Sequence, residues 1–146
     1  MKIFFVRHGE ADGDLVYYGI KQIEKSADFL KQQEMTPPIR LITSIVMRAV
    51  SSAKIIQETL GLSESIQVGW LVNEDGANIA KHIMDFSEVV PPFQTIIAVS
   101  HQPEIKETTS YFAKIFGVNF HTRAKNGSVH LVDTEAKTVQ TLFEPD

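Results

Sequence analysis

Short apolar runs rich in β-branched residues alternate along the chain with longer segments in which apolar residues recur every three or four positions. The short runs predict strands, and the longer segments predict amphipathic helices. The predicted strands cover residues 3–6, 39–43, 66–71, 95–99, 129–132 and 138–143. The predicted helices run from 19 to about 34, from 46 to 60, across 79–90, and from 103 to 116.

Each predicted helix has one apolar face that we expect to be buried. The four faces consist of Ile20, Ile23, Ala27 and Leu30; of Val46, Ala49, Val50, Ala53, Ile56 and Leu60; of Ile79, Ile83, Phe86 and Val90; and of Ile105, Phe112, Ile115 and Phe116. Prolines close the first and third helices, at 37–38 and 91–92, because proline cannot continue a helix. Gly61 closes the second helix, and Pro103 opens the fourth, where its missing N–H costs nothing.

This alternation predicts an α/β fold. The run 95–99 is apolar after its first residue, which is typical of a strand covered on both faces. The last two strands follow Asn126-Gly127 and form a predicted hairpin. We therefore expect residues 1–146 to form a single domain, a three-layer α/β/α sandwich with a mostly parallel central sheet and an antiparallel edge.

Composition and charge narrow the classes of function. Hydrophobic residues make up 43% of the chain and charged residues 22%, as in ordinary globular proteins. The net charge of −4 argues against nucleic acid as a partner. The absence of cysteine excludes disulfides, thiolate metal sites and cysteine nucleophiles, and it fits the cytoplasm. No apolar run is long enough to cross a bilayer, so we expect no membrane partner.

Arg7-His8-Gly9-Glu10, directly after the first predicted strand, is the strongest chemical signal. Side chains at the carboxyl end of a central strand point into the crevice where open α/β sheets bind ligands. Arginine suits phosphate there, since its planar fork can hold two oxygens. The adjacent histidine can act as a base or as a nucleophile.

Two later segments repeat this placement. Arg48 follows the second strand in the segment 44–49, and His101 follows the fourth strand in the segment 99–103. A parallel sheet brings such strand ends together, so Arg7, His8, Arg48 and His101 should form a small cationic pocket. The pattern suits phosphoryl transfer through a phosphohistidine, in which fixed cationic donors stabilise the transferred group. A carboxylic acid is then needed to protonate the leaving group and to activate water.

The three segments resemble those of the histidine phosphatase superfamily, which includes the phosphoglycerate mutases. Residues 7–10 match its RHG(E/Q) motif, residues 44–53 resemble SPLxRAxQTA, and residues 100–103 resemble (G/S)HxP, in the same order. The resemblance implies that His8 is the phosphorylated nucleophile and that Arg7, Arg48 and His101 complete a phosphate pocket. Ile45 stands where the family usually has proline, and Ser52 where it commonly has threonine.

The resemblance also suggests a proton donor. Residues 72–74 resemble the LxE context that carries the acid in mutase-like members, which implies Glu74; Asp12 and Asp75 are the alternatives. The family's other branch has an aspartate directly after the second histidine, where this chain has Gln102. No cofactor is implied. We expect no metal, because two arginines beside His8 and His101 would repel a cation.

Length bears on the substrate. Only about 40 residues separate Leu60 from His101, which leaves no room for the lid segments of larger relatives. An open site favours a substrate presented on a protein surface. The chain is most similar in this respect to the small SixA-type phosphohistidine phosphatases, which implies protein phosphohistidine as substrate and a histidine phosphotransfer domain as partner.

Two other functions stay open at this stage: a phosphatase of a small phosphorylated metabolite, and a non-catalytic module that binds phosphorylated ligands. Arg123 and Lys125 would extend the cationic rim toward a phosphorylated partner, or are simply solvated loop charges. The remaining histidines belong to no motif and are expected at the surface or in packing; they are His82, His121 and His130.

Overall fold

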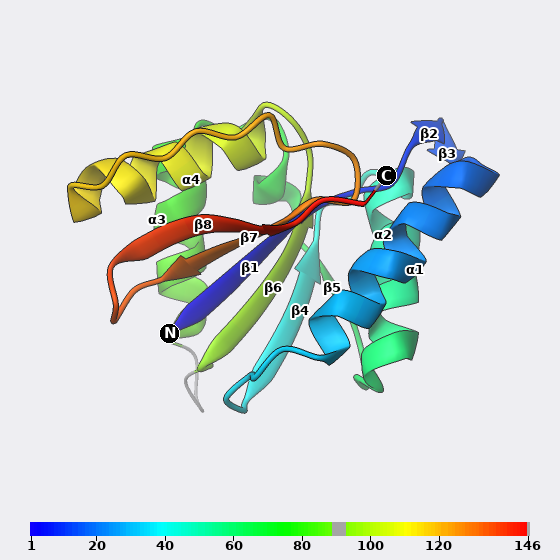
Figure 1. Ribbon diagram of the computed structural model, residues 1–146, viewed down its shortest axis with the longest axis horizontal. Helices are drawn as coiled ribbons and strands as arrows, with labels where there is room; N and C mark the ends of the chain where they lie inside the picture. The colour runs from blue at the N-terminus through cyan, green and yellow to red at the C-terminus, as the bar shows by residue number, and fades with distance from the viewer. Residues whose placement is uncertain (89–92, 146) are drawn as a thin grey trace.

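Six strands form one mixed sheet at the centre of the molecule (Figure 1). The computed structural model describes residues 1–88 and 93–145. In spatial order the strands are β5 (Ile66–Gln67), β4 (Ile39–Thr43), β6 (Thr95–Ser100), β1 (Lys2–Arg7), β7 (Val129–Asp133) and β8 (Thr138–Phe143). The first four are parallel, whereas β7 is antiparallel to β1 and β8 is antiparallel to β7. The predicted mostly parallel sheet with an antiparallel edge is confirmed.

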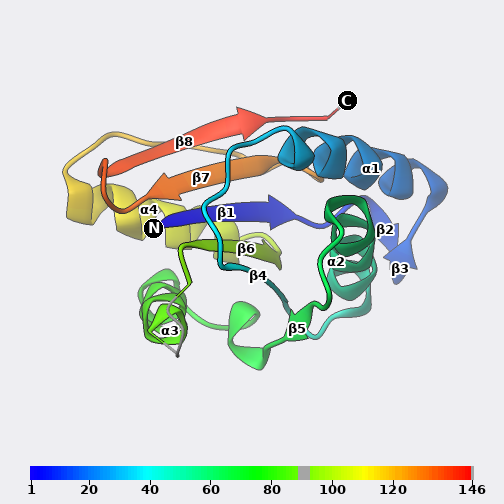
Figure 2. The same cartoon turned by 90° about the horizontal axis from the view of Figure 1, so that it is seen from below.

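Two helices cover each face of this sheet (Figure 2). The helices α1 (Tyr17–Lys31) and α2 (Met47–Leu60) lie on one face, and α3 (Gly76–Ser87) and α4 (Glu104–Phe116) lie on the other. Side chains of β1 alternate between the two layers, as the pleat of a strand requires. Ile3 and Phe5 pack toward α3 and α4, while Phe4 and Val6 pack toward α1 and α2. The predicted three-layer α/β/α sandwich is confirmed.

After the two central strands, β1 and β6, the chain passes to opposite faces of the sheet. After β1 it passes to α1 on one face, and after β6 it passes to α4 on the other face. Because β1 and β6 are neighbours, their carboxyl ends mark the point where open α/β sheets usually bind ligands. His8 follows β1 and His101 follows β6, so both lie at this divergence.

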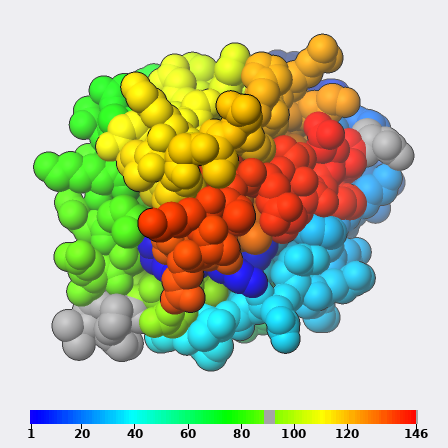
Figure 3. Space-filling view, turned by 60° about the vertical axis from the view of Figure 1, so that its left-hand side comes forward, coloured from blue at the N-terminus to red at the C-terminus, as the bar shows by residue number. Residues whose placement is uncertain are grey.

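The edge strand β8 runs along the surface beside α4 (Figure 3). It also reaches α1, where the rings of Phe29 and Phe143 stack with their centroids 4.8 Å apart. The antiparallel hairpin therefore joins the two helical layers at one side of the sheet.

Two helices differ from the predicted bounds or faces. α1 begins at Tyr17 and ends at Lys31, two or three residues earlier at each end than predicted, and buried Gly19 in its first turn packs on the backbone of Glu10. Ile20, predicted on the apolar face of this helix, is 36% exposed. Ile115, predicted on the buried face of α4, is 59% exposed. Both predictions of burial were wrong at the rim of an otherwise correct apolar face.

The strand predicted at 66–71 is shorter than expected. β5 ends at Gln67, and the chain turns into a short 3-10 helix, η1 (Gly69–Leu71). The turn places Leu71 in the core, where its side chain is fully buried and its carbonyl accepts a hydrogen bond from Ser100 Oγ at 2.7 Å. The strand prediction was therefore wrong for the residues after Gln67.

A small hairpin near the first helix was not predicted. It pairs β2 (Ala11–Asp12) with β3 (Asp14–Leu15) around Gly13, whose φ of 80° lies in the left-handed region that favours glycine. Val90 and the prolines at 91–92, which were predicted to end the third helix, lie outside the described residues. Among the described residues, none of the helices has both the length and the apolar character that crossing a membrane needs.

Candidate active site

His8 is held by its own backbone neighbour and by an arginine. Its Nδ1 lies 2.7 Å from the carbonyl oxygen of Gly9. Because a carbonyl only accepts, Nδ1 carries the proton and Nε2 of the neutral ring has a free lone pair. Arg48 Nε donates to this Nε2 at 3.3 Å. The geometry therefore fixes the tautomer that leaves Nε2 as the nucleophilic atom.

The backbone at Gly9 packs so closely on another segment that only glycine fits there. A Cβ at this position would clash with the carbonyl of Gly19, and the φ of Gly9 lies outside the left-handed region. The N–H of Gly9 donates to Ser52 Oγ at 3.1 Å, and that hydroxyl donates to the carbonyl of Arg48 at 2.7 Å. Ser52, which departs from the family's threonine, thus joins the turn after β1 to the helix that carries Arg48.

His101 approaches His8 from the neighbouring strand. The two ring centroids lie 5.0 Å apart, and the residues are only 4% and 6% exposed. His101 Nε2 lies 2.5 Å from Ser44 Oγ, the residue directly after β4. Three adjacent strands, β4, β6 and β1, therefore each supply a residue to one pocket.

Arg7 is held by a segment that the sequence analysis did not assign to the site. Its Nη1 donates to the carbonyl of Ala124 at 3.0 Å, and its buried Nε has no hydrogen-bond partner among the described residues. Asn126 Nδ2 donates to the carbonyl of His8 at 3.2 Å, and the N–H of Gly127 donates to the carbonyl of Arg7 at 3.0 Å. The segment between α4 and β7 therefore fixes both Arg7 and the backbone of His8.

Electrostatics keep both pocket histidines neutral. Burial lowers the pKa of His8 to about 4, and the charges of His101, Arg7 and Arg48 act in the same direction, against the hydrogen bond to Gly9. Burial, then Arg48 and Arg7, lowers the pKa of His101 to about 4. Burial and Arg48 also lower the pKa of Arg7. A neutral His8 Nε2 beside two guanidinium groups is suited to attack an electrophile that carries negative charge.

Solved structures with the same architecture are available for comparison. The protein histidine phosphatase SixA, solved with tungstate, matches with a TM-score of 0.78 at 17% identity, over 99% of this chain and 96% of that one. SixA from Agrobacterium tumefaciens gives a TM-score of 0.72 at 16% identity, over 99% and 98%. A mycobacterial glucosyl-3-phosphoglycerate phosphatase, solved with VO3, gives 0.71 at 13% identity, over 99% of each chain. This chain has the histidine phosphatase fold. No family model and no curated protein matches the sequence.

Within the histidine phosphatase fold, the structure brings together four of the five predicted site residues: Arg7, His8, Arg48 and His101. Glu74 is half-buried in the segment between η1 and α3, after Asn73, whose φ is 61°. Among the described residues, no hydrogen bond or ion pair joins Glu74 to the other four. Its role as proton donor stays a prediction.

The segment that carries Glu74 is nevertheless tied to the His101 strand. Ser100 Oγ donates to the carbonyl of Leu71, and the N–H of Asn73 donates to Glu104 Oε2 at 2.9 Å. The alternative acids have other positions. Asp75 caps α3 by accepting from the N–H of Asn78 at 2.8 Å, and Asp12 is exposed in β2.

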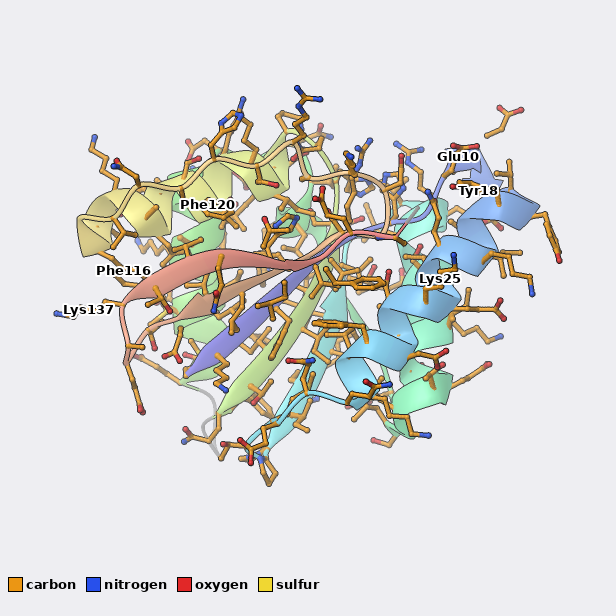
Figure 4. The ribbon with its side chains drawn as sticks, in the orientation of Figure 1. Glu10, Tyr18, Lys25, Phe116, Phe120 and Lys137 are labelled. Carbon is orange, nitrogen blue, oxygen red and sulfur yellow. The ribbon has the colours of Figure 1, made fainter. Side chains whose placement is uncertain are left out.

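An open, polar cleft of about 540 Å³ adjoins the pocket on the Arg7 side. Glu10 and Tyr18 lie beside one another on its wall (Figure 4). The other lining residues are Arg7, Gln22, Arg123, Lys125, Asn126, Glu144 and Pro145. The described part of the chain contains no group of three or more histidine, aspartate or glutamate side chains placed to hold a metal ion.

Proposed function

We propose that this chain is a metal-independent phosphatase that works through a phosphohistidine on His8. The observation that carries the proposal is the neutral His8 ring, whose Nδ1 proton is held by Gly9 and whose Nε2 lone pair faces Arg48. Similar structures were solved with tungstate and with VO3, and such oxyanions are the ligands expected of a cationic pocket.

In the first step, His8 Nε2 attacks phosphorus and the bond from phosphorus to the leaving group breaks. Arg7, Arg48 and His101 stabilise the negative charge on the phosphoryl oxygens. The leaving group takes a proton from Glu74. In the second step, water gives a proton to the Glu74 carboxylate as its oxygen attacks phosphorus, which releases phosphate and restores neutral His8.

We propose protein phosphohistidine as the substrate, with a histidine phosphotransfer domain as the partner. The open cleft beside Arg7 supports this choice, since no described segment covers it and a protein-borne group can enter. The likeness to the protein histidine phosphatase SixA over 99% of the chain also supports it. We place the activity in the cytoplasm, which a chain without cysteine fits.

A small phosphorylated metabolite is the second candidate substrate. Its support is the 540 Å³ polar cleft, which has the volume of a small-molecule site, and the likeness to a glucosyl-3-phosphoglycerate phosphatase. A substrate panel separates the two. A kcat/KM far higher for a sugar phosphate than for protein phosphohistidine would favour the metabolite.

The mechanism is tested by incubating the protein and ³²P-labelled protein phosphohistidine in chelator, followed by an alkaline denaturing quench that preserves phosphohistidine and by acid treatment of a parallel sample. We expect acid-labile label on His8 in the wild type and none in His8→Ala, with turnover reduced by ~10³-fold or more. Full turnover by His8→Ala would contradict the mechanism. Binding of phosphate without any turnover by the wild type would favour a non-catalytic binding module.

A further inference from the structure

Two large apolar side chains face solvent directly beside the candidate pocket. Ile45 follows Ser44, whose hydroxyl contacts His101, and Met47 precedes Arg48, which contacts His8. Both Ile45 and Met47 are 59% exposed, although their sequence neighbours Ser44 and Arg48 point into the site. Single exposed apolar residues are common, but here two stand within three positions at the mouth of a pocket.

A second segment beside the pocket, on the Arg7 side, repeats this alternation with cations. Ala124 is fully buried and its carbonyl accepts from Arg7, while its neighbours Arg123 and Lys125 are exposed and line the cleft. Neither cation forms an ion pair with another described residue. The backbone beneath them is fixed, because Gln102 Nε2 also donates to the carbonyl of Arg123 at 2.8 Å.

Resting on the proposed function, we propose that these two flanks dock the phosphorylated protein. The apolar flank is Ile45 and Met47, and the cationic flank is Arg123 and Lys125. The partner is a folded domain that presents an apolar side chain on one side of its phosphohistidine and acidic side chains on the other. The flanks hold the domain while the phosphoryl group reaches His8.

Charge and chemistry favour this occupant over others. The whole chain carries a net charge of −4, so two cations without described partners beside the pocket are a local feature that matches acidic groups of a partner. Glu10 and Glu144 line the same cleft, which disfavours a uniformly anionic surface such as a lipid bilayer. A small phosphorylated metabolite offers no apolar surface to cover Ile45 and Met47.

The test compares two substrates: a histidine phosphotransfer domain phosphorylated by phosphoramidate, and free phosphohistidine. The variant Ile45→Ser/Met47→Gln should lower kcat/KM for the domain by ~10-fold or more, through KM, because buried apolar contacts carry much of the affinity of an interface. Its kcat/KM for free phosphohistidine should stay unchanged. Ile115→Ser, which truncates an equally exposed isoleucine on α4, is the matched control.

The cationic flank is tested by salt. The wild type should lose kcat/KM for the domain as ionic strength rises, and Arg123→Glu/Lys125→Glu should lower the low-salt value and flatten this dependence. Lys31→Glu/Lys81→Glu, at exposed positions on α1 and α3, makes the same change in net charge away from the cleft and is the control.

The possible failures are distinguishable. Equal losses on both substrates in the Ile45→Ser/Met47→Gln variant, or no loss on the domain, would overturn the docking surface and leave the phosphatase proposal standing. Turnover of free phosphohistidine without turnover of the domain would do the same. Phosphatidylserine vesicles that bind the wild type but not this variant, with kinetics unchanged, would assign the apolar flank to a membrane instead. No turnover of any phosphorylated substrate would overturn the proposed function itself.

Discussion

The hydroxyl of Ser44 lies 2.5 Å from Nε2 of His101, although the two residues are 57 positions apart. Ser44 follows β4 and His101 follows β6, and these strands are parallel neighbours. The contact therefore links two strand ends and holds the orientation of a buried imidazole that has no backbone partner within the described ranges 1–88 and 93–145.

Removing this contact should affect both catalysis and folding. We expect Ser44→Ala to lower kcat by ~10-fold, because the His101 ring loses a partner, and to cost about 1–3 kcal/mol of stability for the unpaired buried group. Steady-state kinetics and urea unfolding measure the two effects. Ser110→Ala, at an exposed position of α4, should change neither. An unaltered kcat in Ser44→Ala would show that the hydroxyl does not position His101.

Arg48 contacts His8 through Nε, an atom that lysine cannot reproduce. Arg48→Lys should therefore lower kcat by ~10²–10³-fold, as the loss of one fixed donor to a developing charge does. Arg40→Lys is the control, since Arg40 pairs with exposed Glu64 at 2.8 Å on another part of the surface. If both variants kept wild-type kcat, Arg48 would not stabilise the transferred group.

The proton donor can be tested through the leaving group. If Glu74 protonates it, Glu74→Gln should lower kcat/KM by ~10²–10⁴-fold for an alkyl phosphate but far less for p-nitrophenyl phosphate, whose leaving group needs no proton. Asp75→Asn and Asp12→Asn should lack this selectivity. Asp75→Asn perturbs only the cap of α3. A selective loss in either aspartate variant, and not in Glu74→Gln, would reassign the donor.

Close packing at Gly9 predicts a cost for any side chain. We expect Gly9→Ala to destabilise the fold by about 1–3 kcal/mol, because its Cβ meets the backbone of Gly19. Gly69→Ala is the matched control, since a Cβ at Gly69 has open space around it. Chemical denaturation compares the two. Equal stabilities would mean that the turn after β1 can move away from α1 at no cost.

Buried histidines make stability depend on pH. Burial lowers the pKa values of His8, His101 and His130 to about 4, below the value of about 6.5 in an unfolded chain. Between these values the unfolded chain binds protons that the folded chain does not, so stability should fall as pH drops from about 6.5 toward 4. Each histidine contributes a slope of up to about 1.4 kcal/mol per pH unit.

Variants can assign the pH dependence of the unfolding free energy to individual histidines. His130 is fully buried and hydrogen-bonded to Ser128 and Thr141, so His130→Gln should flatten the dependence of unfolding free energy on pH. His121→Gln, at an exposed position, is the control. A slope in His130→Gln identical to that of the wild type would contradict the assignment to this histidine.

The pocket could be predicted from sequence wherever residues follow parallel strands, since such strand ends must meet. Arg7, His8, Arg48 and His101 are all of this kind. Ala124 could not be predicted, because it contributes only a carbonyl, which every residue has. The sequence marked Ser52 only as a departure from the family's threonine, and it did not reveal that the hydroxyl links the backbone of Gly9 to that of Arg48. Contacts of this kind depend on tertiary packing and have no signature in a single sequence.

The sequence could not place the proton donor beside the other site residues, for a related reason. Glu74 lies beyond the end of β5, where the chain turns into η1 instead of continuing as a strand. Its placement depends on Asn73 in the left-handed region and on the contact between Asn73 and Glu104. A motif gives the order of residues along the chain, but not the path of an irregular segment.

The central place of β1 has a consequence for biosynthesis. Of the six strands of the sheet β1 is synthesised first, yet its two neighbours, β6 and β7, begin at Thr95 and Val129. The strand β1, whose central residues 3–6 are all apolar, therefore stays with both edges unpaired until β6 and β7 have been synthesised. An unpaired apolar strand exposes the nascent protein to aggregation. Ala124, whose carbonyl accepts from Arg7, lies 117 positions after it, so the contacts that hold the pocket also form only after a long stretch of chain has been synthesised.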